Sequence, residues 1–278
     1  MPPLHPFWQK IDGVAVINLA HRGDRWREIE AQAARIPAGP QLVRIEACLG
    51  STLPGFGRRP WFRGRRTDPR WAARAGCTAS HRRVMLHAQQ QGWKTTLVLE
   101  DDCDLEPLAT CDLDALHRVL FVEHPGWQVC YLGQNEILPP SRRIATCEHI
   151  GELVQVRGCM TAHAYLVRSE ARDWIAGHLL REDAPWAWLA RHRIVDRLYA
   201  RQFFRHFPVF ALSPALLWQI KGYSDIGQNS VDWANMEMVH AVPVSSGFAF
   251  RLKYVHLCLL LLDFVDIFRG WWRRLRGF

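Results

Sequence analysis

The chain has 278 residues, of which 49% are hydrophobic and 22% charged, a composition that excludes wholesale disorder and allows one large folded domain. The formal net charge is +8, and arginine supplies most of the positive charge. This excess favours anionic partners, which include phosphorylated substrates, nucleic acids and acidic membrane surfaces, without choosing among them.

The pattern of apolar residues alternates between strand-like and helix-like segments along the chain. Short β-branched runs predict strands, and apolar residues at helical spacing predict helices. In chain order the pattern predicts a strand at 14–19, a helix to residue 35, a strand at 41–45, a helix at 76–91, a strand at 95–99, a helix at 112–122, a strand at 127–132, a hairpin at 142–156, a strand at 162–167 and a helix to residue 180 that Ser169 caps. Strands that alternate with helices predict an α/β fold with a mainly parallel central sheet.

Residues 50–74 are rich in glycine, proline and arginine and predict a long basic loop. Within it, the arginines of segment 58–74 are interleaved with Trp61, Phe62 and Trp71, a combination that suits stacking on single-stranded nucleic acid. A polyanion-binding or nucleic-acid-binding protein is therefore the alternative hypothesis for this chain.

Four acidic residues follow the strand predicted at 95–99. They are Glu100, Asp101, Asp102 and Asp104. In open α/β sheets ligands bind at the carboxyl ends of the strands, and carboxylates crowded there repel one another unless a cation neutralises them. Oxygen ligands suit Mn²⁺ or Mg²⁺, so a cation that bridges a diphosphate is the favoured interpretation. A solvated acidic turn that caps the next helix is the alternative. The acids also argue against nucleic-acid binding, since without a metal they would repel phosphate.

Six segments, in order along the chain, resemble glycosyltransferase family 25, which includes lipooligosaccharide and collagen galactosyltransferases. The segments are Val16-Ile-Asn-Leu19 with Arg22 and Arg25, Gly76-Cys-Thr-Ala-Ser-His81, Leu97-Val-Leu-Glu-Asp-Asp102, Thr161-Ala-His-Ala-Tyr-Leu-Val167, Val195-Asp196, and Gln219 with Ser224-Asp225-Ile226. The chain departs from the family pattern in the arginine-rich loop at 58–74 and at Gly158-Cys-Met160.

The resemblance implies a GT-A-like nucleotide-binding sandwich and a hexosyltransferase that inverts the configuration at the sugar carbon. The implied donor is a UDP-sugar, with galactose as the expected sugar, and the implied acceptor is a lipooligosaccharide or another glycan or glycolipid. Glu100, Asp101 and Asp102 resemble the family's DxD-type metal motif, with Asp102 expected to contact the metal most directly. A family member that keeps the fold without activity is a further alternative.

Further site residues are carried over from the matching segments. Asn18, Arg22 and Arg25 follow the first strand and are expected to bind the base or a phosphate of the donor. Ser80 and His81 are expected to open a helix whose amide groups face the diphosphate.

The acceptor hydroxyl must lose a proton during transfer, so the reaction needs a base. Asp196 is the first candidate, because it matches an acid of the family and follows two apolar residues. Asp225 is the second candidate, or it helps to organise a loop over the donor. His163, predicted inside a strand, is a weaker candidate, since such a histidine is more often a core residue.

The sequence divides into a predicted domain, 1–245, and a basic and aromatic helical tail, 246–278. The tail has an apolar middle followed by Arg269-Gly-Trp-Trp-Arg-Arg-Leu-Arg276, which suits the surface of an anionic membrane. A helix that docks on the domain or on a second subunit is the alternative. Eight scattered cysteines and the lack of a secretory signal pattern predict a cytoplasmic enzyme, peripheral to the inner membrane face, with no nucleic-acid partner.

Overall fold

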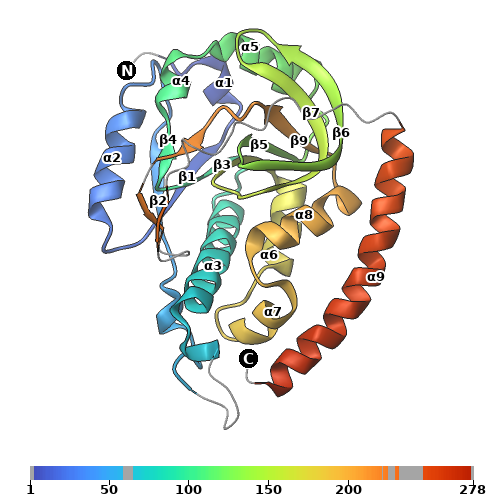
Figure 1. Ribbon diagram of the computed structural model, residues 1–278. Helices are drawn as coiled ribbons and strands as arrows, with labels where there is room; N and C mark the ends of the chain where they lie inside the picture. The colour runs from blue at the N-terminus through green and yellow to red at the C-terminus, as the bar shows by residue number, and fades with distance from the viewer. Residues whose placement is uncertain (1–2, 59–64, 221, 225–228, 232–246, 277–278) are drawn as a thin grey trace.

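The structure is a computed structural model that describes residues 3–58, 65–220, 222–224, 229–231 and 247–276. Its centre is an eight-stranded sheet with the strand order β2-β1-β3-β8-β5-β9-β7-β6 (Figure 1). These strands are β1 (Gly13–Asn18), β2 (Leu42–Glu46), β3 (Thr95–Glu100), β5 (Val129–Gly133), β6 (Glu136–Cys147), β7 (Gly151–Met160), β8 (Ala164–Arg168) and β9 (Val209–Ser213). Two small sheets pair β4 (Cys103–Asp104) with β10 (Trp218–Gln219), and β11 (Gly222–Ser224) with β12 (Asn229–Val231).

The α/β class is confirmed, but the prediction of a mainly parallel sheet is wrong in detail, because the sheet is mixed. Strand β1 runs parallel to both β2 and β3, and β5 runs parallel to β9. Strand β8 lies antiparallel between β3 and β5, and the β6–β7 hairpin joins β9 in antiparallel fashion. The parallel half of the sheet thus brings the ends of β1 and β3 together at one edge.

Helices cover both faces of the sheet. Successive side chains of a strand point to opposite faces, so the apolar strands present hydrophobic side chains on each face. Val14 and Val16 of β1 pack into one core with α1, α2 and α5, whereas Ala15 and Ile17 pack into a second core with α3, α6 and α8. The helices are α1 (Pro6–Gln9), α2 (Gly23–Ala33), α3 (Pro69–Gln90), α4 (Glu106–Thr110), α5 (Leu113–His117), α6 (Ser169–His178), α7 (Pro185–His192), α8 (Val195–His206) and α9 (Phe248–Leu275), with short turns η1 (Gly50–Thr52), η2 (Arg65–Thr67) and η3 (Arg118–Glu123). The result is a three-layered α/β/α arrangement.

Helix α3 is longer than the sequence pattern predicted. It begins at Pro69, because the Asp68 carboxylate caps it by accepting from the backbone N–H of Arg70 at 3.0 Å. The predicted basic loop therefore ends before residue 69, and Trp71 is a buried residue of this helix. Two smaller predictions were also wrong by about a residue, since Ser169 is the first residue of α6 and His163 precedes β8 instead of lying in it.

The predicted C-terminal helix is confirmed as α9, which lies along the flank of the molecule (Figure 1). Residues 232–246, where the predicted domain boundary falls, lie outside the described residues, so the division at 245 stays a prediction. No helix within the described residues combines the length and the apolar character needed to cross a membrane. All eight cysteines carry free thiols.

Candidate active site

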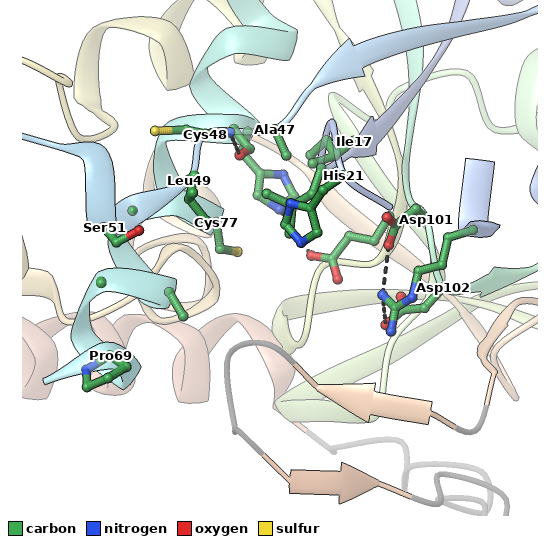
Figure 2. Close-up of a pocket in the computed structure, with 18 of the residues that line it drawn as sticks. Ile17, His21, Ala47, Cys48, Leu49, Ser51, Pro69, Cys77, Asp101 and Asp102 are labelled. Carbon is green, nitrogen blue, oxygen red and sulfur yellow. Dashed lines mark hydrogen bonds and ion pairs between the residues drawn. The ribbon is translucent and has the colours of Figure 1, made fainter. Parts of the chain in front are cut away.

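A cavity of about 450 Å³ opens at the edge of the sheet where β1 and β3 end. Its wall combines the segment after β1, the segment between β2 and η1, the middle of α3 and the acidic end of β3. Figure 2 shows His21, Cys77, Asp101 and Asp102 around this space. The predicted residues that line it are Arg25, Ser80, His81, Glu100, Asp101 and Asp102.

Two glycines allow the wall of the cavity to close. A Cβ atom on Gly50 would lie 1.6 Å from the carbonyl oxygen of Ala72, and one on Gly76 would lie 2.3 Å from that of Cys48. Any larger side chain at either position would push the segment after β2 away from α3. Ser80 reinforces the contact, because its Oγ accepts from the backbone N–H of Cys48 at 2.8 Å and donates to the carbonyl oxygen of Gly76 at 2.7 Å.

The prediction that Ser80 and His81 open a helix is wrong. Both lie in the middle of α3, where the backbone N–H groups are already bonded within the helix and cannot face a diphosphate. The prediction failed because the glycine and small residues at 76–80 suggested a helix start, whereas Asp68 and Pro69 supply the true one. Any contribution from these two residues must come from their side chains.

His81 is the centre of a chain of hydrogen bonds that ends on Glu100. Its Nε2 lies 3.3 Å from Oε1 of Glu100, its Nδ1 lies 3.0 Å from the hydroxyl of Tyr165, and that hydroxyl lies 3.3 Å from the hydroxyl of Tyr199. An ionised Glu100 accepts only, so Nε2 carries the hydrogen and Nδ1 accepts from Tyr165. Tyr199 must then donate to Tyr165. The chain fixes both the tautomer of His81 and the position of Glu100.

Burial is the largest influence on Glu100 and opposes its ionisation. The hydrogen bond from His81 is the largest opposing influence, and together with the positive charge of Arg25 it outweighs burial and lowers the pKa of Glu100 below its ordinary value. Glu100 is therefore a carboxylate at neutral pH.

Asp101 is held by two predicted donor-binding residues. Asn18 Nδ2 donates to its Oδ2 at 2.6 Å, and Arg25 NH1 donates to its Oδ1 at 2.9 Å. Burial still raises the pKa of Asp101, although Arg25 and Asn18 oppose that shift. Arg22, predicted beside them, forms an ion pair with Asp24 at 3.0 Å.

Asp102 is the least compensated acid of the three. Gln219 Nε2 donates to its Oδ1 at 3.3 Å, and Arg25 NH1 lies 3.7 Å from its Oδ2. Burial and the negative charges of Glu100 and Asp101 raise the pKa of Asp102 to about 7. An added positive charge would relieve this repulsion.

Two buried amide oxygens near these acids are ligands of the type that a hard divalent cation prefers. Oδ1 of Asn18 and Oε1 of Gln219 have no hydrogen-bond partner within the described part of the chain, although each side chain donates to an acid of the cluster. Together with the Asp102 carboxylate they supply the oxygen donors that Mn²⁺ or Mg²⁺ prefers. Cys77, His81 and Glu100 form a second group, whose ligand atoms lie within 4.8 Å of one another. Their sulfur and nitrogen atoms suit a softer ion such as Zn²⁺.

The predicted catalytic residues have different surroundings. Asp196 lies in the first turn of α8 and accepts from the backbone N–H groups of Arg197 at 2.7 Å and Thr161 at 3.4 Å. Burial raises the pKa of Asp196, and Glu100 and His81 are near enough to influence it. Thr161 has a φ of 63°, a strained backbone conformation for a β-branched residue. Asp196 is not part of the cavity wall as described.

His163 is fully buried, and its Nε2 lies 3.1 Å from the carbonyl oxygen of Leu217. Burial is the main reason that the pKa of His163 is lowered, so the ring is neutral at pH 7. Its own carbonyl oxygen accepts from the backbone N–H of Glu100 at 2.8 Å, which positions that acid. The cavity wall as described does not include His163. Asp225 lies outside the described residues.

His21, Cys77 and Gln219 are among the cavity residues that had no role in the sequence-based prediction. Gln219 and Cys77 belong to segments that resemble family 25, but nothing in the sequence showed that β10 pairs with β4 beside the acids. Trp71, one of the stacking residues of the alternative nucleic-acid hypothesis, is buried, and the guanidinium of Arg74 lies 4.8 Å from the centre of its ring. It is therefore not exposed for stacking on a base. Residues 59–64 of that loop lie outside the described residues.

No protein-family model matches the chain. A protein of Bos taurus named "Probable inactive glycosyltransferase 25 family member 3" is 28% identical to it over 196 residues. The match covers 66% of this chain and 32% of that protein, so the chain spans about a third of the length of this relative. At this distance the similarity suggests glycosyltransferase family 25, and the relative is itself named as probably inactive.

Proposed function

We propose that this chain is a metal-dependent, inverting glycosyltransferase that transfers a hexosyl group from a UDP-sugar to a hydroxyl of a glycan or glycolipid. The observation that carries the proposal is the set of three acids that line one cavity at the ends of parallel strands, with Asp102 short of compensating charge. The distant similarity to a family 25 protein supports the same class of reaction. Galactose, a lipooligosaccharide acceptor, a GT-A-like fold and a cytoplasmic location are the finer parts of this proposal.

The donor site that we propose uses the cavity beside Arg25. A volume of about 450 Å³ lies within the range of small-ligand sites. Arg25 already forms ion pairs with Asp101 and Asp102, and a diphosphate in the cavity would give its guanidinium a further anionic partner. Asn18, Gln219 and Asp102 would hold the cation, which when bound offsets the negative charge on the departing diphosphate.

In the proposed chemistry one bond forms and one breaks at the anomeric carbon, and one proton is transferred. The acceptor oxygen attacks the anomeric carbon, the bond from that carbon to the diphosphate oxygen breaks, and the hydroxyl proton moves to a carboxylate. We assign this base to Asp196, with Asp225 as the alternative, because burial raises the pKa of the Asp196 carboxylate above its ordinary value and so makes it a stronger base. Glu100, fixed by His81, would shape the wall against which the donor lies.

The experiment that tests the proposal measures ligand-dependent thermal stability. UDP-sugars with Mn²⁺ should raise the melting temperature more than GDP-sugars or CMP-sugars do, and Asp102→Ala should abolish the shift. Asp104→Ala is the matched control, because Asp104 accepts from the backbone N–H of Glu106 at 3.0 Å and is not in the cavity wall. A full shift in Asp102→Ala would refute the site.

A second candidate function is a family member without catalytic activity that still binds a nucleotide. Two observations favour it: the relative is named as probably inactive, and Arg25 occupies one carboxylate of the cluster. The two candidates differ in one readout. Release of UDP from a UDP-sugar in the presence of Mn²⁺ supports the enzyme, whereas a thermal shift without any release supports the inactive protein.

A further inference from the structure

Helix α9 is attached to the body through a polar face. This 28-residue helix lies beside β6, α7 and α8 (Figure 1). Its only two acids, Asp263 and Asp266, both point toward α8. Asp263 accepts from Arg205 NH1 at 2.6 Å, and Asp266 forms ion pairs with Arg201 and, at 3.5 Å, with Arg197.

Further contacts hold the rest of the inward face. Arg273 NH1 donates to the carbonyl oxygen of Ala190 in α7 at 2.6 Å, and Leu259 is buried. The guanidinium of Arg142 in β6 lies 5.2 Å from the ring of Phe248. These contacts lie on one side of α9 from its first residue to its last turn, so its opposite side faces outward along the whole length.

The outward face is apolar. Six large side chains on it are each between 51% and 76% exposed: Phe250, Leu261, Phe264, Phe268, Trp271 and Trp272. A helix on the surface of a globular protein normally turns its apolar stripe to the core and its charges to solvent. In α9 the acids face the body and the apolar residues face out. An exposed apolar surface of this extent indicates a binding partner.

Positive charge borders this face. Helical spacing places Arg251, Arg269 and Arg276 along one edge and Lys253 along the other, and all four are exposed. The guanidinium of Arg276 lies 4.7 Å from the ring of Trp272. Of these cations, Arg269 lies 3.5 Å from Oδ1 of Asp266, whereas the outward face of α9 has no acid next to Arg251, Lys253 or Arg276, since both acids of the helix point toward α8.

These features distinguish a lipid surface from a second copy of the chain. A second α9 would bring cations against cations, since neither outward face has an acid to pair with them. The apolar surface is also broader than a coiled-coil seam, because Leu260 and Ile267 beside it are each 49% exposed. Aromatic and aliphatic side chains bordered by arginine and lysine instead match the interface of an anionic bilayer.

We propose that the outward face of α9 binds the surface of an anionic phospholipid bilayer, with the helix axis parallel to the membrane. The apolar side chains enter the interfacial region, and the bordering cations contact lipid phosphates. The proposal goes beyond the transferase and does not depend on it, since no residue of the cavity takes part. It would hold the whole protein at the membrane while α9 stays bound to α7 and α8.

The experiment is co-sedimentation of the full chain with vesicles of phosphatidylcholine alone or mixed with phosphatidylglycerol. We expect binding to the mixed vesicles that weakens with added salt, and at least about tenfold weaker binding to phosphatidylcholine alone. Leu261→Glu/Phe268→Glu should weaken binding to the mixed vesicles at least about tenfold, because two carboxylates would have to enter the interface.

Leu4→Glu/Val122→Glu is the matched control, since it makes the same change in charge at two exposed apolar positions outside α9. It should bind like the unmodified chain, and both double variants should unfold at the unmodified temperature. Equal binding by the two double variants would overturn the proposal. So would a stable dimer in the absence of vesicles that only the α9 variant dissociates, since the outward face would then bind a second copy.

Discussion

Two acids of this molecule, Asp102 in the cavity and Asp266 in α9, have pKa values that are shifted in opposite directions. In the cavity, burial and two neighbouring carboxylates raise the pKa of Asp102 to about 7. On the inward face of α9, burial opposes the ionisation of Asp266 as well, but the hydrogen bond from Arg201 and the charges of Arg201, Arg197 and Arg269 outweigh it and lower its pKa. Asp266, which holds α9 against α8, is surrounded by arginines. Asp102, just after the end of β3, has less positive charge around it than negative charge. This contrast supports the proposal that a cation binds in the cavity.

The largest expected effect is a loss of activity when Asp102 of the cavity is replaced. Asp102→Asn should reduce the release of UDP from a UDP-sugar at least about 100-fold, because a cation ligand is lost. Its unfolding free energy should not fall, since the change removes repulsion between like charges. Asp104→Asn should keep its activity. Loss of stability without loss of activity in Asp102→Asn would place Asp102 with the structural acids instead.

The second prediction concerns Asp266, on the inward face of α9. Asp266→Asn should lower the free energy of unfolding in urea by about 2 kcal/mol, because Arg197 and Arg201 lose their buried partner. Asp183→Asn removes an exposed ion pair with Arg181 and should leave stability unchanged. Equal stabilities for the two variants would show that the ion pairs under α9 contribute little.

The third prediction uses the raised pKa of Asp102. Below pH 7 a proton occupies Asp102 and a cation must displace it, so the affinity for Mn²⁺ should fall about tenfold, or about 1.4 kcal/mol, for each pH unit below 7. Above that pH the affinity should become constant. Electron paramagnetic resonance titrations of Mn²⁺ across this range would measure it. An affinity that is independent of pH between about 5.5 and 8 would exclude Asp102 as a ligand.

The smallest expected effect tests the chain that holds Glu100. Tyr165→Phe removes the hydroxyl next to Nδ1 of His81 and should lower kcat about fivefold, or about 1 kcal/mol, with KM for the donor little changed. Tyr199 is one hydrogen bond further from His81 than Tyr165 is, so Tyr199→Phe should lower kcat by a smaller factor. A lower melting temperature with an unchanged kcat would show that the chain serves packing alone.

The sequence predicted the elements around the cavity better than it predicted their pairing. The apolar runs before Asn18 and Glu100 are strands, and the acids follow the second one as expected. The position of β8 between β3 and β5 depends on contacts between segments far apart in the chain, which local periodicity does not encode. The ion pair between Arg25 and Asp101 spans 76 residues and was invisible for the same reason.

The close approach of Gly50 to α3 limits how this cavity can diversify. Neither Gly50 nor Gly76 has room for a methyl group, so the backbone on that side of the cavity is fixed in place. Ser51 and Phe56 on the same wall have side chains that line the cavity. In proteins with this fold, we therefore expect the ligand preference of the cavity to change by substitution of such side chains, while the two glycines stay glycine.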